Sequence, residues 1–194
     1  MHYPLSMSFK IVALAPQLSV TTSDGTLRFY VKQKLLKLKE AVTVFADTAQ
    51  SQALYTIKAD RVLDFSARYQ FTAADGQPIG AIKRQGMRSL WKAHYDIFDG
   101  DTPALTIREA NPWAKVMDAL LGEIPIVGMF TGYLFHPAYV VSRPDGTVVL
   151  RAKKQPAFFE SKFTIEQESE LREHEEIQAL LGLIMMLLLE RSRG

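Results

Sequence analysis

The chain has 194 residues, of which 47% are hydrophobic and 23% charged, a composition typical of one globular domain with a sizeable core rather than of a disordered segment. Its formal net charge is only +2, so any attraction to nucleic acid or to an anionic membrane must come from local clusters. The absence of cysteine excludes disulfides, thiolate metal sites and thiol nucleophiles, and it is consistent with a reducing compartment.

The N-terminal segment MHYPLSMSFKIVALAP carries no basic region of the kind that begins a signal peptide, and its apolar run is too short for one. We therefore expect a cytoplasmic protein, peripheral at the membrane if its ligand is a lipid. The first predicted strand lies near residues 9–14.

A repeated hairpin pattern organises most of the chain. Asp-Gly pairs stand between runs rich in Val, Ile, Tyr, Phe and Thr, which is a strong hairpin signal. Asp47 occupies the place of a further turn but lacks the glycine, so a longer loop is expected there. The four pairs are Asp24-Gly25, Asp75-Gly76, Asp99-Gly100 and Asp145-Gly146.

The second strand of each hairpin contains an aliphatic residue followed directly by a cation. Neighbouring residues in a strand point to opposite faces, so the aliphatic side chain faces the core and the cation faces outward. The first four cations are spaced 26, 25 and 25 residues apart. If the repeats are adjacent in space, the cations form a partial basic collar outside the sheet. The pairs are Val31-Lys32, Ile57-Lys58, Ile82-Lys83, Ile107-Arg108 and Leu150-Arg151.

Two single strands show the same one-sided pattern. Ala93, Tyr95 and Ile97 share one face, while polar residues alternate with them, and the segment 159–166 alternates in the same way. Five hairpins, the opening strand and this closing strand total about twelve strands.

The repeat is interrupted between Arg108 and Arg151. Asn111-Pro112 predicts the start of a short helix ending at Gly122. The following stretch 124–141 carries no formal charge, but its glycines and prolines break helical continuity, and its last residues are needed as a strand. We interpret 124–137 as a covering segment in preference to a loop that touches a membrane.

The C-terminal segment predicts a helix over 171–191. Its uncharged part, Ile177 to Leu189, covers about 20 Å, whereas a bilayer core is about 30 Å thick. A helix without a polar face must be enclosed on all sides. The predicted fold is therefore mainly β: a closed antiparallel β-barrel of about twelve strands around this helix, in one domain 1–194 with an insertion at 111–137. The acidic residues before the helix are interpreted as a solvated strand face and a favourable helix N-terminus.

The order of these elements resembles a known family. The run YVKQKLLKLKEAVTVFADTAQSQALYTIKAD, hairpins ending in AIKRQ and TIREA, then GYLFHPAYVVSRPDGTVVLRAKKQPAFFESKFTI and the apolar helix, are similar to bacterial LURP-one-related proteins. That family is similar to the tubby C-terminal domain and the phospholipid scramblases, which implies a twelve-stranded closed barrel around a hydrophobic helix. The phosphoinositide-binding residues of tubby have no matching motif here, and the resemblance implies no activity.

Motifs for catalysis are lacking. His174-Glu175 is not followed by the second histidine of a zinc-binding H-E-x-x-H pattern, and the four histidines are scattered. No Walker, G-x-S-x-G or G-x-G-x-x-G pattern occurs. We therefore expect no catalytic residue, no metal and no cofactor.

Three functions remain open at this stage. The favoured one is a non-enzymatic binding or interaction module. Its ligand would be an anionic phospholipid or a phosphorylated molecule, or its partner would be a protein. Binding of nucleic acid and a transmembrane span are not expected. The candidate binding residues are Lys32, Lys58, Lys83, Arg108 and Arg151. Surface charge for solubility is the simpler explanation of the same residues. The alternatives are a scramblase-like membrane-associated protein and an enzyme of unrecognised type.

Overall fold

The computed structural model describes residues 1–10, 17–32, 41–61, 67–85, 93–110, 138–156 and 160–191. The short helix expected after Pro112 and the apolar segment 124–137 lie outside the described residues. The predicted strand near residues 9–14 lies only partly within them.

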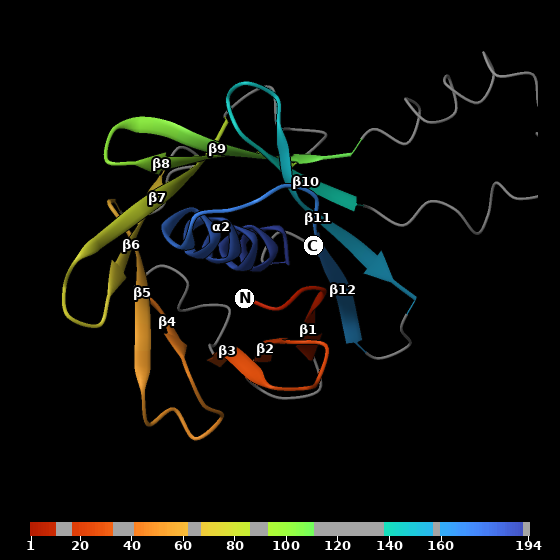
Figure 1. Ribbon diagram of the computed structural model, residues 1–194. Coiled ribbons are helices and arrows are strands. Elements are labelled where there is room, and N and C mark those ends of the chain that lie inside the picture. Colours follow the sequence, from red (N-terminus) through yellow and green to blue (C-terminus); the bar gives the residue numbers. More distant parts are fainter. Residues whose placement is uncertain are drawn as a thin grey trace, which may run out of the picture.

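The described residues form twelve antiparallel strands that close into a barrel. Each strand pairs with its neighbours in the sequence, and β1 pairs with β12 to close the ring (Figure 1). This confirms the predicted fold. The strands are β1 (Leu5–Lys10), β2 (Gln17–Thr21), β3 (Leu27–Lys32), β4 (Val42–Phe45), β5 (Ala53–Ala59), β6 (Arg68–Ala73), β7 (Pro78–Arg84), β8 (His94–Asp99), β9 (Thr102–Glu109), β10 (Ala138–Ser142), β11 (Val148–Gln155) and β12 (Glu160–Gln167).

All four Asp-Gly pairs lie in the turns that join consecutive strands at one end of the barrel, which we call the turn end. In three of them the aspartate carboxylate accepts a hydrogen bond from the amide two residues later, at 2.8 to 3.0 Å, and the glycine has a φ of +87° or +90°. Asp47 lies in the longer β4–β5 loop, as predicted, and its carboxylate accepts hydrogen bonds from the amides of Ser51 and Gln52.

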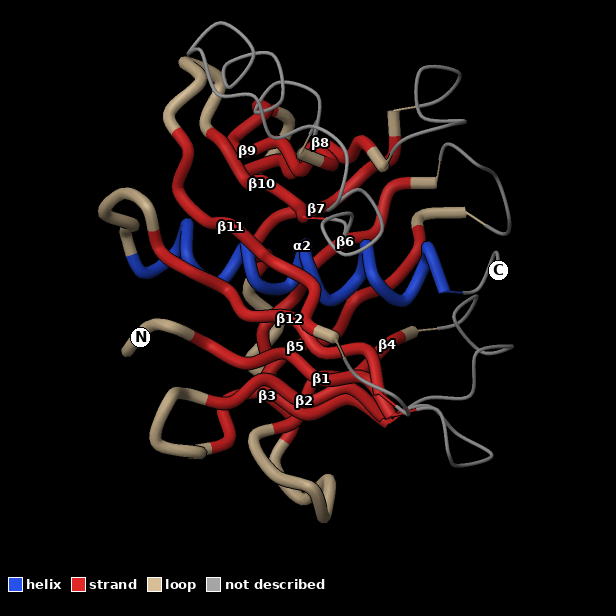
Figure 2. Tube along the Cα trace, turned by 90° about the vertical axis from the view of Figure 1, so that its right-hand side faces the viewer, coloured by secondary structure: helices blue, strands red, loops and turns tan. Residues whose placement is uncertain are grey.

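Helix α2 (Glu173–Arg191) begins at the turn end and runs lengthwise through the barrel (Figure 2). Apart from Ile177, every side chain from Glu175 to Leu188 is buried. The inward side chains of the strands surround it, as alternation predicted: Ile57, Ile82 and Ile107 are at most 1% exposed. The helix therefore occupies the lumen and supplies the centre of the hydrophobic core.

The structure corrects three details. The opening strand β1 begins at Leu5, well before the predicted position, because Leu5, Met7 and Phe9 alternate inward with polar residues. Helix α2 begins at Glu173 rather than at residue 171. The acidic residues at its start are not all solvated, since Glu175 and Glu176 are 5% and 7% exposed.

Candidate ligand-binding surface

The five cations of the predicted collar lie on every second strand of the barrel. Their aliphatic neighbours are buried, so the cations project from the outer wall as the alternation predicted. Four of them are exposed, and Arg151 is half-buried. Lys32 lies on β3, Lys58 on β5, Lys83 on β7, Arg108 on β9 and Arg151 on β11.

Strand register fixes the relative heights of these cations. Lys58 lies opposite Gln70, and Gln70 opposite Ala81, two residues before Lys83 on the same strand. The same offset of two residues separates Lys83 from Arg108. The collar between β5 and β9 therefore follows a regular, slightly slanted path around the wall.

Arg108 and Arg151 lie at the same height, because both are paired with Val140 of the intervening strand β10. Their surroundings differ. Arg108 donates a hydrogen bond from Nε to Nε2 of His94 at 3.2 Å. Arg151 is held in an ion pair by Glu168, and this raises the pKa of its guanidinium. Arg151 is thus engaged within the protein, whereas the described residues provide no ion pair for Lys58 or Lys83.

Two further cations join this surface that the hairpin repeat did not reveal. Lys10 on β1 lies in line with Lys32 on β3, because both are paired with Gln17. Lys162 on β12 is exposed and lies opposite Gln155 and Ser8. Neither follows the aliphatic–cation repeat of the hairpins; only the one-sided alternation of their own strands could have pointed to them.

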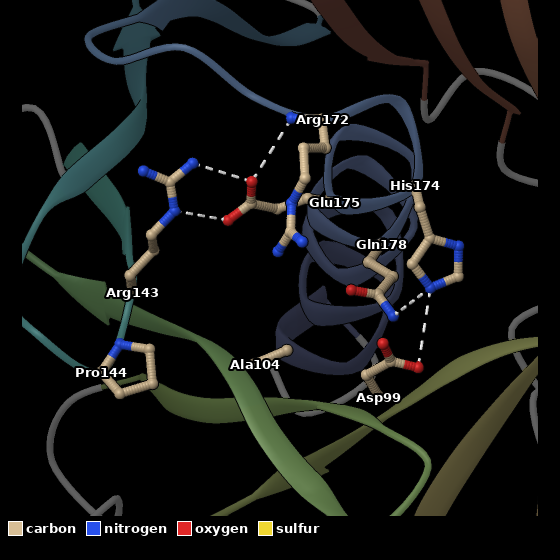
Figure 3. Close-up of a pocket in the computed structure, with 8 residues that line it drawn as sticks. All are labelled: Asp99, Ala104, Arg143, Pro144, Arg172, His174, Glu175 and Gln178. Atoms are coloured by element: carbon tan, nitrogen blue, oxygen red, sulfur yellow. Dashed lines mark hydrogen bonds and ion pairs between the residues drawn. The ribbon is translucent and has the colours of Figure 1, made fainter.

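A hollow of about 250 Å³ opens at the turn end beside the start of α2 (Figure 3). Arg143 from the β10–β11 turn donates from Nε and Nη2 to the two carboxylate oxygens of Glu175, at 2.7 and 2.8 Å. The Nε2 of Gln178 donates to the carbonyl oxygen of Ile79 at 2.7 Å and lies 2.9 Å from Nε2 of His174. These polar groups are bonded to one another and hold the start of the helix against the barrel.

The electrostatics of this hollow follow from the Arg143–Glu175 pair. Hydrogen bonds from Arg143 lower the pKa of the Glu175 carboxyl below its usual value, and the carboxylate in turn raises the pKa of Arg143. Both groups therefore stay charged at neutral pH. The pair is a fixed structural connection between a turn and the helix, not an open ligand site.

A second hollow, of about 610 Å³, lies on the other side of the same helix terminus. Leu27, Phe29 and Tyr55 contribute to its apolar wall, and Phe29 and Tyr55 make an edge-to-face contact with ring centroids 5.9 Å apart. At its base the Met1 ammonium group donates to Glu176 at 2.9 Å. The carboxylate of Glu176 is thus already paired within the protein.

The part of the chain that the structure describes contains no group of three histidine or acidic side chains placed to hold a metal ion. Nor does any helix within it combine the length and apolar character needed to cross a bilayer.

Comparison with curated proteins and with solved structures finds no match to this chain. The sequence model of the LURP-one-related family matches residues 27–171, which contain strands β3 to β12 and end just before α2. The match covers well over half of the chain, and the barrel around a hydrophobic helix is the architecture that the resemblance implied. The chain belongs to the LURP-one-related family.

Proposed function

We propose that this protein is a non-enzymatic binding module that recognises an anionic, phosphate-bearing ligand through cations on the outer wall of its barrel. The module would work in the cytoplasm, and at the membrane surface when the ligand is a phospholipid. The observation that carries the proposal is the arc formed by Lys58, Lys83 and Arg108, three exposed cations in regular register on β5, β7 and β9.

The filled lumen supports an outer site. Leu183, Ile184 and Met185 are fully buried in the middle of the barrel, where a barrel-shaped binding protein would keep its ligand. In each hollow at the turn end a buried carboxylate is already paired with a cation of the protein, Glu175 with Arg143 and Glu176 with the Met1 ammonium group. The outer wall therefore offers the charged groups that an external ligand could reach.

The arc includes one acidic residue. Asp96 lies opposite Lys83 in the register, which places a negative charge within the arc. Its carboxylate accepts hydrogen bonds from Gln85 at 2.5 Å and from Thr106 at 3.3 Å. Lys83 has no ion pair with it among the described residues, so the lysine can meet an external phosphate.

The test is co-sedimentation of the triple variant Lys58→Gln, Lys83→Gln, Arg108→Gln with phosphatidylserine or phosphoinositide vesicles at low and high salt. Exposed charges contribute little to folding. The free energy of unfolding, measured by thermal melts, should therefore stay within about 0.5 kcal/mol per site of the wild-type value. Vesicle binding should lose up to about 1 kcal/mol per cation, and wild-type binding should fall with salt.

A soluble competitor separates the two sources of phosphate. If a low concentration of inositol hexakisphosphate displaces the wild-type protein from vesicles, the phosphate groups alone suffice for binding, as in a free phosphorylated ligand. Failure to compete indicates a requirement for the bilayer surface. Should the wild type not bind any of these probes at low salt, or the triple variant bind equally well, the arc serves solubility alone and the proposal is wrong.

A further inference from the structure

Charged side chains are separated along the barrel axis, although the chain as a whole is nearly neutral. At the turn end the exposed and half-buried acidic side chains outnumber the cations, which are Arg28, Arg143, Arg172, Arg151 beside Glu168, and Arg68, whose guanidinium reaches Asp101. The acidic residues there are Asp24, Asp47, Asp75, Asp99, Asp101, Asp145, Glu168, Glu170 and Glu173. This end of the molecule is therefore negative.

Toward the opposite end, where α2 finishes, the balance is reversed. The cations lie in or beside the ends of strands around the whole circumference, from β1 through β12. Among the described residues they are Lys10, Lys32, Lys58, Arg61, Lys83, Arg84, Arg108, Lys153, Lys154, Lys162 and Arg191. We call these residues the basic end.

The acidic side chains near the basic end are largely engaged. Asp60 accepts hydrogen bonds from the Arg68 amide at 3.1 Å and from Arg61. Glu190 accepts a hydrogen bond from the Tyr95 hydroxyl at 2.5 Å and lies 3.7 Å from Arg84. Glu166 is paired in the same way with Lys153, at 2.6 Å. The cations still outnumber the acidic residues of this end among the described residues, so an approaching surface meets a positive field; those acidic residues are Asp60, Asp96, Glu109, Glu166 and Glu190.

We infer that the protein docks end-on on an anionic phospholipid bilayer, with the basic end against the lipid headgroups and the acidic turn end facing away. This rests on the proposed function and names its ligand as a membrane surface. The cations form a ring around a barrel end, so a small phosphorylated molecule could contact only a few of them at once. A flat layer of anionic headgroups can meet more of them at the same time.

Repulsion strengthens the orientation. In the reverse orientation the carboxylates of the turn end would face the anionic headgroups, and like charges repel across distances of about one Debye length. The molecule therefore carries an attractive end and a repulsive end, and it should align before it makes contact.

The absence of cysteine allows a direct test of orientation with single labels. Pro156→Cys places a cysteine at an exposed site after β11, at the basic end, and Gln77→Cys places one in the exposed β6–β7 turn. Each variant carries an environment-sensitive fluorophore and is mixed with phosphatidylcholine vesicles that contain phosphatidylserine, including some with a quencher attached to the lipid headgroup. Ala110→Cys, at the end of β9, replaces Pro156→Cys if that variant does not fold.

The inference predicts a shift of emission to shorter wavelength and quenching for the label at position 156, and no change for the label at position 77. Co-sedimentation of the same samples reports binding separately. Binding with an equal or larger response at position 77 overturns the end-on orientation and leaves the proposed function standing. A lack of co-sedimentation at low salt overturns the proposed function and this inference with it.

Discussion

At the scale of single residues, Glu175 shows how the barrel holds its core helix. A carboxylate on a residue that is 5% exposed would be costly without a partner, and Arg143 supplies two hydrogen bonds to it. Arg143 also donates to the carbonyl oxygen of Glu170 at 2.7 Å, so one side chain ties the β10–β11 turn to the segment that leads into α2.

The variant Glu175→Gln should lower the free energy of unfolding by about 1.5 to 3 kcal/mol at neutral pH, because it removes charged hydrogen bonds. The pKa of Glu175 is lowered in the folded protein, so its stabilisation is present above the unfolded-state pKa of about 4.3 and is lost as the pH falls through the folded value. Urea unfolding of both proteins across the acid range should therefore show their stability difference shrinking at low pH.

The matched control is Glu168→Gln, which removes the partner of Arg151 on the outer wall, where both side chains are partly exposed. This change should cost less than about 1 kcal/mol. A stability difference for Glu175→Gln that stays constant at every pH would contradict the role assigned to its charge.

The side of the barrel wall on which a side chain lies could be predicted from the sequence. Its hydrogen-bond or ion-pair partner could not. An aliphatic residue followed by a cation was enough to place Lys58 and Lys83 on the outer wall. The partner of Arg151 was not predictable, because it depends on how the segment after β12 lies beside β11. The same holds for Glu175, whose arginine is 32 residues away in the sequence.

At the scale of elements, two glycines let α2 approach the wall. A Cβ atom on Gly182 would lie 2.5 Å from Cδ1 of Ile97, so β8 packs directly on the helix backbone there. Gly80 on β7 has a φ of +150°, and a Cβ atom there would lie 2.9 Å from Nε2 of Gln178 on the helix and 2.5 Å from the carbonyl oxygen of Phe98 on β8. This close approach leaves no room for a ligand between helix and strands at these positions.

The variant Leu183→Asp should lose most or all of the folded state. Leu183 is 0% exposed, and the change replaces packed apolar atoms by a buried carboxylate without a partner. Leu→Ala changes at such sites cost about 2 to 5 kcal/mol, against a typical total stability of about 5 to 15 kcal/mol, and the charge adds to that cost.

The control for the helix is Glu173→Gln at its exposed first turn, which should shift stability by no more than about 1 kcal/mol. Thermal melts measure the stability of both variants. If Leu183→Asp melts like the wild type and loses only vesicle binding, the helix is a peripheral membrane element and not the core.

Elements with a strong local signal could be predicted from the sequence. The Asp-Gly pairs predicted four hairpins, and the uncharged stretch of α2 predicted an enclosed helix. The early start of β1 was missed because Leu5 and Met7 alternate with serines over only a few residues, a short pattern that carries little weight without knowledge of its neighbours β2 and β12.

At the scale of the whole molecule, closure of the barrel separates charges that are mixed along the sequence. Along the chain, acidic turns and cationic strand ends alternate, so their charges average to a formal +2. In the antiparallel barrel all the Asp-Gly turns reach one end and the lysines of β3, β5 and β7 reach toward the other. The sequence predicted the collar, but the separation of charge appears only once strand direction and register are known.

Position along the barrel axis, and not net charge, should determine how strongly the protein binds an anionic bilayer. Two double variants test it, since each removes two positive charges: Lys58→Gln with Lys83→Gln near the basic end, and Arg28→Gln with Arg172→Gln at the turn end. The measurement is co-sedimentation with phosphatidylserine-containing vesicles at low salt. The first pair should weaken binding by up to about 2 kcal/mol, or roughly thirtyfold, and the second should leave it unchanged or stronger. Equal weakening by both pairs, or greater weakening by the turn-end pair, would contradict the account.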